Sequence, residues 1–153
     1  SYLKEKMAET AAVLGGEFSG HICFGERWYG FDDGIYAGAR LLEIVGAQST
    51  SFAELMAEFP KSISTPELKI VVSELDKFSI IKNILSNGNF DDGTITTIDG
   101  IRVDYIDGWG LVRASNTGPY LTLRFEADST ESLDRIRSLF REQLQNVDPS
   151  LNF

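Results

Sequence analysis

Residues 101–127 read IRVDYIDGWGLVRASNTGPYLTLRFEA, and this stretch decides the fold class of the second half of the chain. Apolar and polar side chains alternate in Ile101–Tyr105 and in Tyr120–Ala127, which is typical of strands with one buried face. The pair Asp107-Gly108 is a turn signal that leads into Trp109–Ala114. The stretch therefore predicts three consecutive antiparallel strands.

Further elements flank these strands. A strand over Thr94–Ile98 is expected to join Ile101 through Asp99-Gly100, a strong hairpin signal. Leu68–Val72 is expected to be another strand, and helical spacing predicts helices over Lys77–Leu85 and from Ser129 or Thr130 to about Gln145. We therefore expect residues 67–153 to form an α+β domain, an antiparallel sheet covered by helices. Its length suffices for an independent core.

Residues 1–61 are organised differently. Helical patterns at Tyr2–Ala12, Gly34–Val45 and Phe52–Glu58 accompany one clear short strand, Ile22–Phe24. Helices with so little strand cannot make a complete sheet, so we expect an incomplete α/β piece whose strands pair with residues absent from this chain. Prolines and small polar residues crowd together before Leu68, and residues 62–66 are therefore predicted to be a hinge linker between two domains.

Bulk composition argues against several classes of protein. The formal net charge is −9, from 14 basic and 23 acidic side chains, and an acidic surface repels nucleic acid. No stretch approaches the roughly 20 apolar residues that span a bilayer. Neither nucleic acid nor membrane is therefore expected as a partner. The single cysteine, Cys23, lies in an apolar run, and we expect it to be buried in a protein of the reducing cytoplasm.

The first stretch whose side chains could bind a ligand is Gly16–His21. Glu17, Ser19 and His21 alternate, so an extended backbone would turn all three side chains to one face. A carboxylate, a hydroxyl and an imidazole suit a ligand rich in hydroxyl groups. From spacing alone, a polar loop with a surface histidine is the simpler alternative.

The second stretch is Arg113–Pro119, between two expected strands. A turn of small polar residues can present backbone N–H groups to an anion, and Arg113 adds a guanidinium that grips phosphate with parallel hydrogen bonds. Arg124 on the next strand could turn toward the same loop or toward solvent. A plain hairpin connection is the alternative that the residues alone leave open.

Both stretches resemble one family, the α-D-phosphohexomutases, and within it the bacterial phosphomannomutase/phosphoglucomutase group. The family's sugar loop reads Gly-Glu-Met-Ser-Gly-His, and here Gly16–His21 carries Phe18 in place of Met, at a position expected to look inward. Its phosphate loop reads Arg-Ala-Ser-Asn-Thr, then Glu or Thr, then Pro, and here Gly118 takes the variable place. The departure at Gly118 puts in doubt any contact made by that side chain. The stretch Arg27–Gly34 also resembles the family.

The resemblance implies the C-terminal portion of a four-domain enzyme. Residues 1–61 would end the third, sugar-recognition domain, and residues 67–153 would form the fourth, phosphate-binding domain. A phosphoserine and a magnesium loop would lie in domains absent here, because neither Thr-x-Ser-His-Asn-Pro nor Asp-Gly-Asp occurs in the sequence. No metal ligand is therefore expected in this chain. A start at Ser1, within a helical pattern, is also expected of a piece of a longer protein.

The implied reaction interconverts hexose 6-phosphate and hexose 1-phosphate, for glucose and mannose, with Mg²⁺ and a glucose 1,6-bisphosphate intermediate. Enzymes of this kind supply precursors for exopolysaccharides. By resemblance, Glu17 and Ser19 would bind sugar hydroxyls, and His21 would bind substrate and could shuttle a proton. The phosphate that is not reacting would be held by the residues of the second loop: Arg113, Ser115, Asn116 and Thr117, with Gly118 and Arg124 as further possibilities.

A stand-alone phosphosugar-binding regulatory module is the alternative function. The incomplete sheet expected in residues 1–61 favours the enzyme, since an independent module would not leave its sheet open. An RNA-binding α+β domain is disfavoured by the net charge and by the lack of aromatic and basic motifs on the strands.

Overall fold

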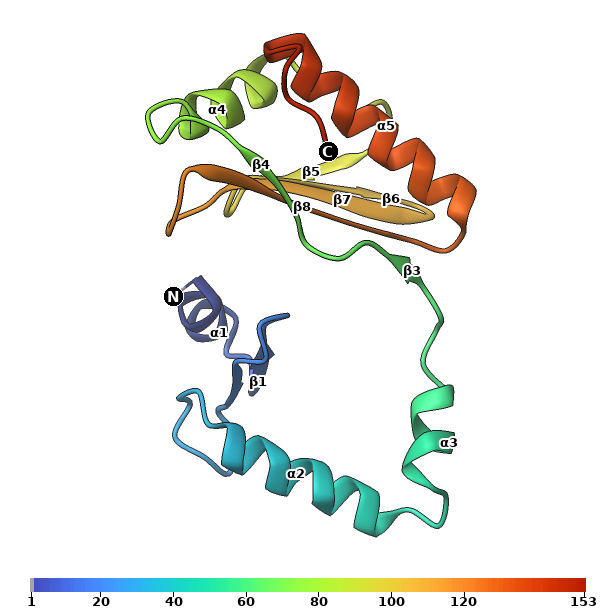
Figure 1. The fold of residues 1–153 in the computed structure, drawn as a ribbon. Helices are drawn as coiled ribbons and strands as arrows, with labels where there is room; N and C mark the ends of the chain where they lie inside the picture. Colours follow the sequence, from blue (N-terminus) through green and yellow to red (C-terminus); the bar gives the residue numbers. More distant parts are fainter. Residues whose placement is uncertain (1) are drawn as a thin grey trace. The chain divides into compact units, whose positions relative to one another are not determined.

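The computed structural model describes residues 2–153, and its contacts divide the chain into two compact units, Ser1–Pro60 and Lys61–Phe153 (Figure 1). The first unit contains three helices and two short strands. These elements are α1 (Tyr2–Thr10), β1 (Leu14–Gly16), β2 (Ile22–Phe24), α2 (Gly34–Ala47) and α3 (Phe52–Ala57).

Strands β1 and β2 form an antiparallel pair in which Leu14 lies opposite Phe24. Strand β2 has the predicted bounds, whereas β1 was not predicted, because three residues that include two glycines show no alternation. Packing explains the glycine at position 15, because a Cβ there would lie 2.5 Å from the Met7 sulfur. Helix α1 therefore packs against β1 only because this position lacks a side chain.

Helices α2 and α3 begin where the sequence predicted. The Asp33 carboxylate accepts a hydrogen bond from the Tyr36 N–H, and the Ser51 hydroxyl accepts one from the Glu54 N–H. Glu54 accepts in turn from the Ser51 N–H, which completes a capping box. Both caps depend only on local sequence, since each joins residues three positions apart.

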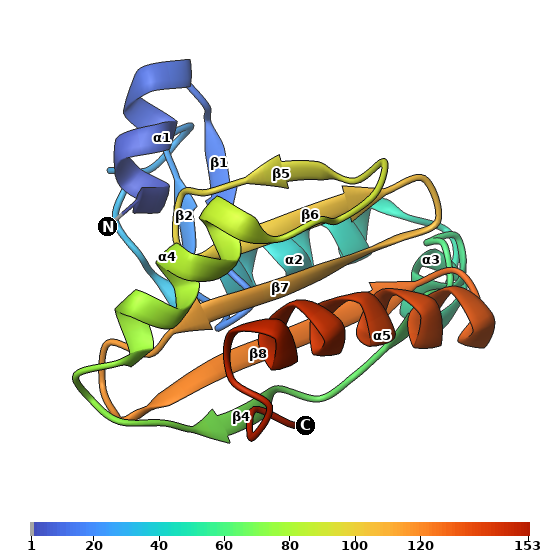
Figure 2. The same cartoon turned by 90° about the horizontal axis from the view of Figure 1, so that it is seen from above.

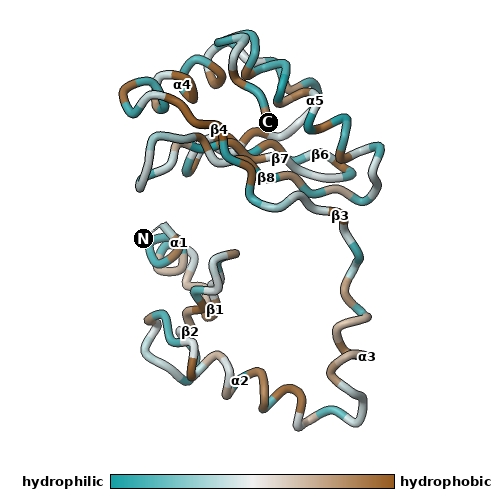
Figure 3. The backbone as a smooth tube through the Cα atoms, viewed as in Figure 1, coloured by the Kyte–Doolittle hydropathy of each residue, from teal (hydrophilic) through white to brown (hydrophobic). Residues whose placement is uncertain are grey.

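The apolar side chains of the first unit are poorly covered. Cys23 is buried as predicted, but none of the described residues of α1, α2 or α3 is buried. Ile35 and Leu42 of α2 are 90% and 73% exposed, and Figure 3 shows apolar stretches, in brown, along this helix. The two-stranded sheet and the uncovered α2 agree with the expectation of an incomplete α/β piece.

The second unit is an antiparallel sheet with two helices. Its strand order is β3-β8-β7-β6-β5, and β4 also pairs with β8 (Figure 2). The strands are β3 (Ile63–Ser64), β4 (Leu68–Val71), β5 (Thr94–Thr96), β6 (Ile101–Tyr105), β7 (Gly108–Ala114) and β8 (Tyr120–Ala127). The helices are α4 (Lys77–Asn87) and α5 (Thr130–Val147). The predicted α+β class is confirmed.

Helices α4 and α5 cover one face of the sheet (Figure 1). The alternation on β8 is as predicted: Leu121, Leu123 and Phe125 are fully buried. The Phe125 ring meets the Phe140 ring of α5 edge-on at 5.3 Å between centroids.

Within residues 2–153, no helix is both long and apolar enough to cross a membrane.

The predicted linker over residues 62–66 differs from what the structure shows. Ile63 pairs with Ala127, and the Thr65 N–H donates to the Phe125 carbonyl at 2.9 Å. The buried Thr65 hydroxyl accepts a hydrogen bond from the Phe125 N–H at 3.2 Å. Residues 63–65 are therefore fixed to β8, because they satisfy backbone groups at a sheet edge that would otherwise lack partners.

The β5–β6 connection is also longer than predicted. Thr96 pairs with Arg102, so β5 ends two residues before Ile98 and the turn is not a two-residue hairpin. Gly100 has a φ of +86°, which fits a longer turn closed by a left-handed residue.

The Asp107 carboxylate ties the β6–β7 turn to the start of α5. It accepts from the Ser132 hydroxyl at 2.5 Å and from Arg135 at 2.6 Å. Hydrogen bonding to Ser132, and secondarily to Arg135, holds the pKa of this carboxyl below its usual value.

Asp107→Asn should therefore reduce the free energy of unfolding near neutral pH. Because the folded-state pKa is lowered, the stabilisation is present above the unfolded-state pKa and is lost as pH falls through the folded-state value. Urea unfolding at pH 7 and near pH 2 would measure the difference between variant and parent, which should shrink in acid. Asp92→Asn, at an exposed loop carboxylate, is the control. An equal difference at both pH values would contradict the assignment.

Candidate functional site

Each unit presents one of the predicted binding loops. In the first unit, residues 17–21 connect β1 to β2 in a tight turn. The Glu17 N–H donates to the His21 carbonyl at 2.9 Å, and the Gly20 N–H donates to the Glu17 carbonyl at 3.0 Å. Gly20 has a φ of +86°, a conformation that most other residues adopt only with strain.

The side chains of Glu17, Ser19 and His21 come together on this turn. The Ser19 hydroxyl lies 3.2 Å from a Glu17 carboxylate oxygen and 2.5 Å from His21 Nδ1. His21 Nδ1 is 3.4 Å from the same Glu17 oxygen. All three residues are exposed, so their remaining donors and acceptors can reach a ligand.

This convergence has a different cause from the one predicted. The sequence argument assumed an extended backbone, but the loop is a turn, and the turn itself brings the three side chains together. Phe18, expected to look inward, is instead 83% exposed.

Asp32 joins this group from the segment before α2. Its Oδ1 accepts a hydrogen bond from the Ile22 N–H at 3.0 Å, and its Oδ2 lies 3.8 Å from His21 Nε2. The imidazole is therefore flanked by Glu17 on one side and Asp32 on the other. The sequence gives no local sign of this contact, because His21 and Asp32 lie 11 positions apart.

The second loop lies at the end of the β7–β8 hairpin, and Arg113 is near its start. One guanidinium nitrogen donates to Asp99 Oδ2 at 3.2 Å. A guanidinium has five N–H donors, so this ion pair leaves others available for a ligand. Asp99, which the sequence placed only in a turn, thus orients the arginine.

The hydroxyl groups of Ser115 and Thr117 organise the loop itself. The buried Ser115 Oγ accepts from the Thr117 N–H at 3.2 Å and lies 3.3 Å from Thr117 Oγ1. The Ser115 N–H donates to the Tyr120 carbonyl at 3.0 Å, which closes the hairpin. Asn116 and Thr117 are exposed at the tip of this ordered turn.

Tyr120 is a further member of the group that the sequence did not indicate. Its hydroxyl lies 3.3 Å from Thr117 Oγ1, and the Lys69 ammonium lies 4.7 Å from its ring centroid. Hydrogen bonding to Ser115 and Thr117 lowers the pKa of the Tyr120 phenol from its usual value. Gly118 makes room for this ring, since a Cβ at 118 would lie 2.5 Å from it.

Arg124 lies on β8 two residues beyond Thr122, the cross-strand partner of Arg113. Alternation therefore places Arg113 and Arg124 on the same sheet face, opposite the one that the helices cover. The structure thus brings Arg113, Ser115, Asn116, Thr117 and Gly118 into one loop region, with Arg124 on the adjoining face.

Among residues 2–153, no group of three or more His, Cys, Asp or Glu side chains could hold a metal ion. The described residues therefore do not fit a magnesium site.

Two family models match the chain. Residues 1–63 match the phosphoglucomutase/phosphomannomutase alpha/beta/alpha domain III, and residues 67–143 match the phosphoglucomutase/phosphomannomutase C-terminal domain. The chain belongs to the phosphoglucomutase/phosphomannomutase family.

Curated relatives agree with this family. A phosphomannomutase/phosphoglucomutase of Pseudomonas aeruginosa is 56% identical over 99% of this chain and 33% of its own length. A phosphoglucomutase of Neisseria gonorrhoeae is 48% identical over 95% of this chain and 32% of its own length. The chain thus spans about a third of the length of these relatives.

A solved structure of a phosphoglucomutase/phosphomannomutase family protein from Burkholderia thailandensis is similar to this chain. The TM-score is 0.87 at 45% identity, over 97% of this chain and 31% of the other. The resemblance stated from the sequence is confirmed at the level of the family.

The Asp99-Gly100 turn should decide how Arg113 is held. A Cβ on Gly100 would lie 2.3 Å from the Val112 carbonyl oxygen and 2.5 Å from the Arg113 Cβ, and φ is positive there. Gly100→Ala should therefore cost about 1–3 kcal/mol of unfolding free energy and displace the Arg113 amide resonance. Denaturant unfolding and amide NMR measure both effects. Gly38→Ala, where a Cβ meets nothing within 4 Å, is the control. Unchanged stability in Gly100→Ala would show that this turn does not fix the arginine.

Proposed function

We propose that this chain is the sugar- and phosphate-binding portion of a phosphohexomutase that interconverts hexose 6-phosphate and hexose 1-phosphate. The observation that carries the proposal is the loop at the end of β7–β8. There, Arg113 is oriented by Asp99, and two linked hydroxyls order a turn with an exposed tip. Such a loop can hold a phosphate dianion by charge-assisted hydrogen bonds, which contribute about 1.5–3 kcal/mol each.

The proposed roles follow from the chemistry of each loop. Arg113, Ser115, Asn116 and Thr117 bind the phosphate that is not reacting and so fix the orientation of the substrate. The Glu17 carboxylate accepts hydrogen bonds from sugar hydroxyls shared by glucose and mannose, and the Ser19 hydroxyl both donates and accepts. His21, held between Glu17 and Asp32, is in a position to accept or donate a proton. Arg124 adds positive charge to the sheet face that adjoins the phosphate loop.

Further parts of the proposal lie outside this chain. The phosphoserine and Mg²⁺ implied by the resemblance belong to other domains of the same enzyme, and the chain's span of about a third of its relatives supports their existence. Bound Mg²⁺ would supply electrostatic stabilisation of the transferring phosphoryl group. We propose that glucose 1,6-bisphosphate is the intermediate of the reaction. The first unit would belong to domain 3 and the second unit to domain 4 of the enzyme, which we expect in the cytoplasm.

Titration with glucose 1-phosphate tests the proposed phosphate site. Amide NMR of the 153-residue chain at low salt should show saturable shifts in residues 113–118. Arg113→Ala should weaken binding about tenfold or more, since a charge-assisted bond contributes about 1.5–3 kcal/mol. Arg135→Ala removes the same charge from α5 and should leave the affinity within about twofold. No saturable shift in the parent chain at millimolar ligand would overturn an autonomous phosphate site.

The chain alone should show no mutase activity. The sequence has neither the phosphoserine motif nor the Asp-Gly-Asp motif. A coupled assay that detects glucose 6-phosphate formed from glucose 1-phosphate, with Mg²⁺ and glucose 1,6-bisphosphate added, measures this directly. Turnover by the purified chain that is abolished in Arg113→Ala would contradict the assignment of catalytic groups to other domains.

A further inference from the structure

Lys77 occupies a position that is unfavourable for a lysine. Its side chain is only 2% exposed, and it is the first residue of α4. Burial removes the hydration of an ammonium group, and the N-terminal end of a helix dipole repels positive charge. No capping hydrogen bond from the Asp76 side chain offsets this repulsion. A buried ammonium in this place needs partners that compensate for the lost hydration and for the repulsion by the helix dipole.

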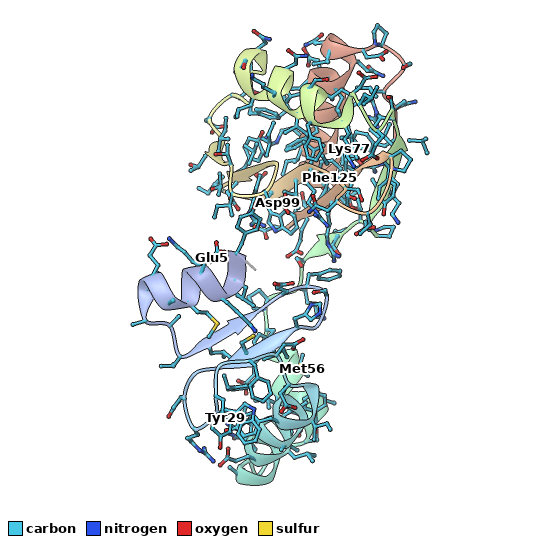
Figure 4. The ribbon with its side chains drawn as sticks, turned by 90° about the vertical axis from the view of Figure 1, so that its left-hand side faces the viewer. Glu5, Tyr29, Met56, Lys77, Asp99 and Phe125 are labelled. Carbon is cyan, nitrogen blue, oxygen red and sulfur yellow. The ribbon has the colours of Figure 1, made fainter. Side chains whose placement is uncertain are left out.

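The ammonium lies 5.2 Å from the centroid of the Phe78 ring and has two polar partners. Nζ lies 2.6 Å from a carboxylate oxygen of Glu74, one turn earlier, and donates to the Gly118 carbonyl at 3.3 Å. The second contact crosses 41 positions of sequence and ends on the phosphate loop. Figure 4 labels Lys77 among the side chains of the second unit.

The Gly118 carbonyl is the point where the loop is held. It accepts from the Tyr120 N–H at 3.0 Å as well as from Lys77, so both of its lone pairs are used. The next carbonyl, of Pro119, accepts from the Val72 N–H at 3.0 Å. Two successive carbonyls of the loop are thus bound, one by the residue that follows β4 and one from α4. Asn116 and Thr117 remain exposed at the tip of the loop, where their side chains can face a ligand.

We propose that Lys77 is a positioning residue of the phosphate loop: its buried ammonium fixes the Gly118 carbonyl and thereby preorganises Ser115, Asn116 and Thr117 for a phosphate group. This inference rests on the proposed function of the loop. It also explains how a glycine at 118 is compatible with an ordered loop, since the backbone carbonyl rather than a side chain is the anchor.

The test compares Lys77→Met with Lys82→Met in the 153-residue chain. Met keeps the length of the side chain but removes every donor, and Lys82 is an exposed lysine on the same helix. Lys77→Met should weaken binding of inorganic phosphate at least fivefold relative to Lys82→Met. It should also speed hydrogen exchange of the Tyr120 amide without ligand, more than that of the Val112 amide in the core. Lys77→Arg, which keeps the charge and donors, should restore part of the affinity.

Two results would overturn the proposal: an unchanged phosphate affinity in folded Lys77→Met, or equal acceleration of exchange at Tyr120 and Val112. The second would mean that Lys77 contributes only to global stability. If the parent chain binds no phosphate, the proposed function fails, and the ligand-free exchange result still decides whether Lys77 positions the loop.

If Lys77→Met does not fold, Glu74→Gln carries the test. The Glu74 side chain is 62% exposed, so its replacement spares the core. Without its ion pair, the ammonium should turn toward water and release Gly118. Exchange at Tyr120 should then be faster and phosphate binding about two- to threefold weaker; no change in either would overturn the proposal.

Discussion

The pairing of β7 with β8 is the constraint on which the second unit depends. Seven residue pairs, from Gly108↔Ala127 to Ala114↔Leu121, fix the register of the two longest strands. This register turns Val112, Leu123 and Phe125 toward α4 and α5, and it turns Arg113 and Arg124 to the opposite face. A slip of one residue would exchange the two faces, burying the arginines and exposing the core. The buried core and the position of the candidate phosphate loop are therefore both set by the pairing of β7 with β8.

The same hairpin determines how the phosphate loop is supported. The loop begins where the pairing ends, and three neighbouring segments then hold it: the β5–β6 turn through Asp99, the residue after β4, Val72, and α4 through Lys77. Each contact acts on a different group, namely the Arg113 guanidinium, the Pro119 carbonyl and the Gly118 carbonyl. A loop restrained at several points loses little conformational entropy when it binds, which favours affinity for a small anion. The first unit holds its own loop more simply, by one turn closed between β1 and β2.

Interactions between residues close together in the sequence determined much of the secondary structure of this protein. Strand β8 and strand β2 have their predicted bounds, and the caps at Asp33 and Ser51 were predictable because capping involves residues only three positions apart. The two candidate binding loops could be singled out from the sequence, since the residues of each are contiguous. Alternation along β8 was sufficient to predict the buried face.

The tertiary structure decided what contiguous residues could not show. Residues 63–65 join the sheet rather than a linker because β8 has an unpaired edge, and pairing over about 60 positions leaves no local pattern. The loop at Glu17–His21 is a turn rather than extended, because β1 and β2 pair on either side of it. Asp99, Asp32 and Lys77 contact the two candidate binding loops only in the folded chain. The physical reason is the same in each case: a hydrogen bond or ion pair between distant residues depends on which surfaces the packed core brings together, and that information is absent from any short stretch of sequence.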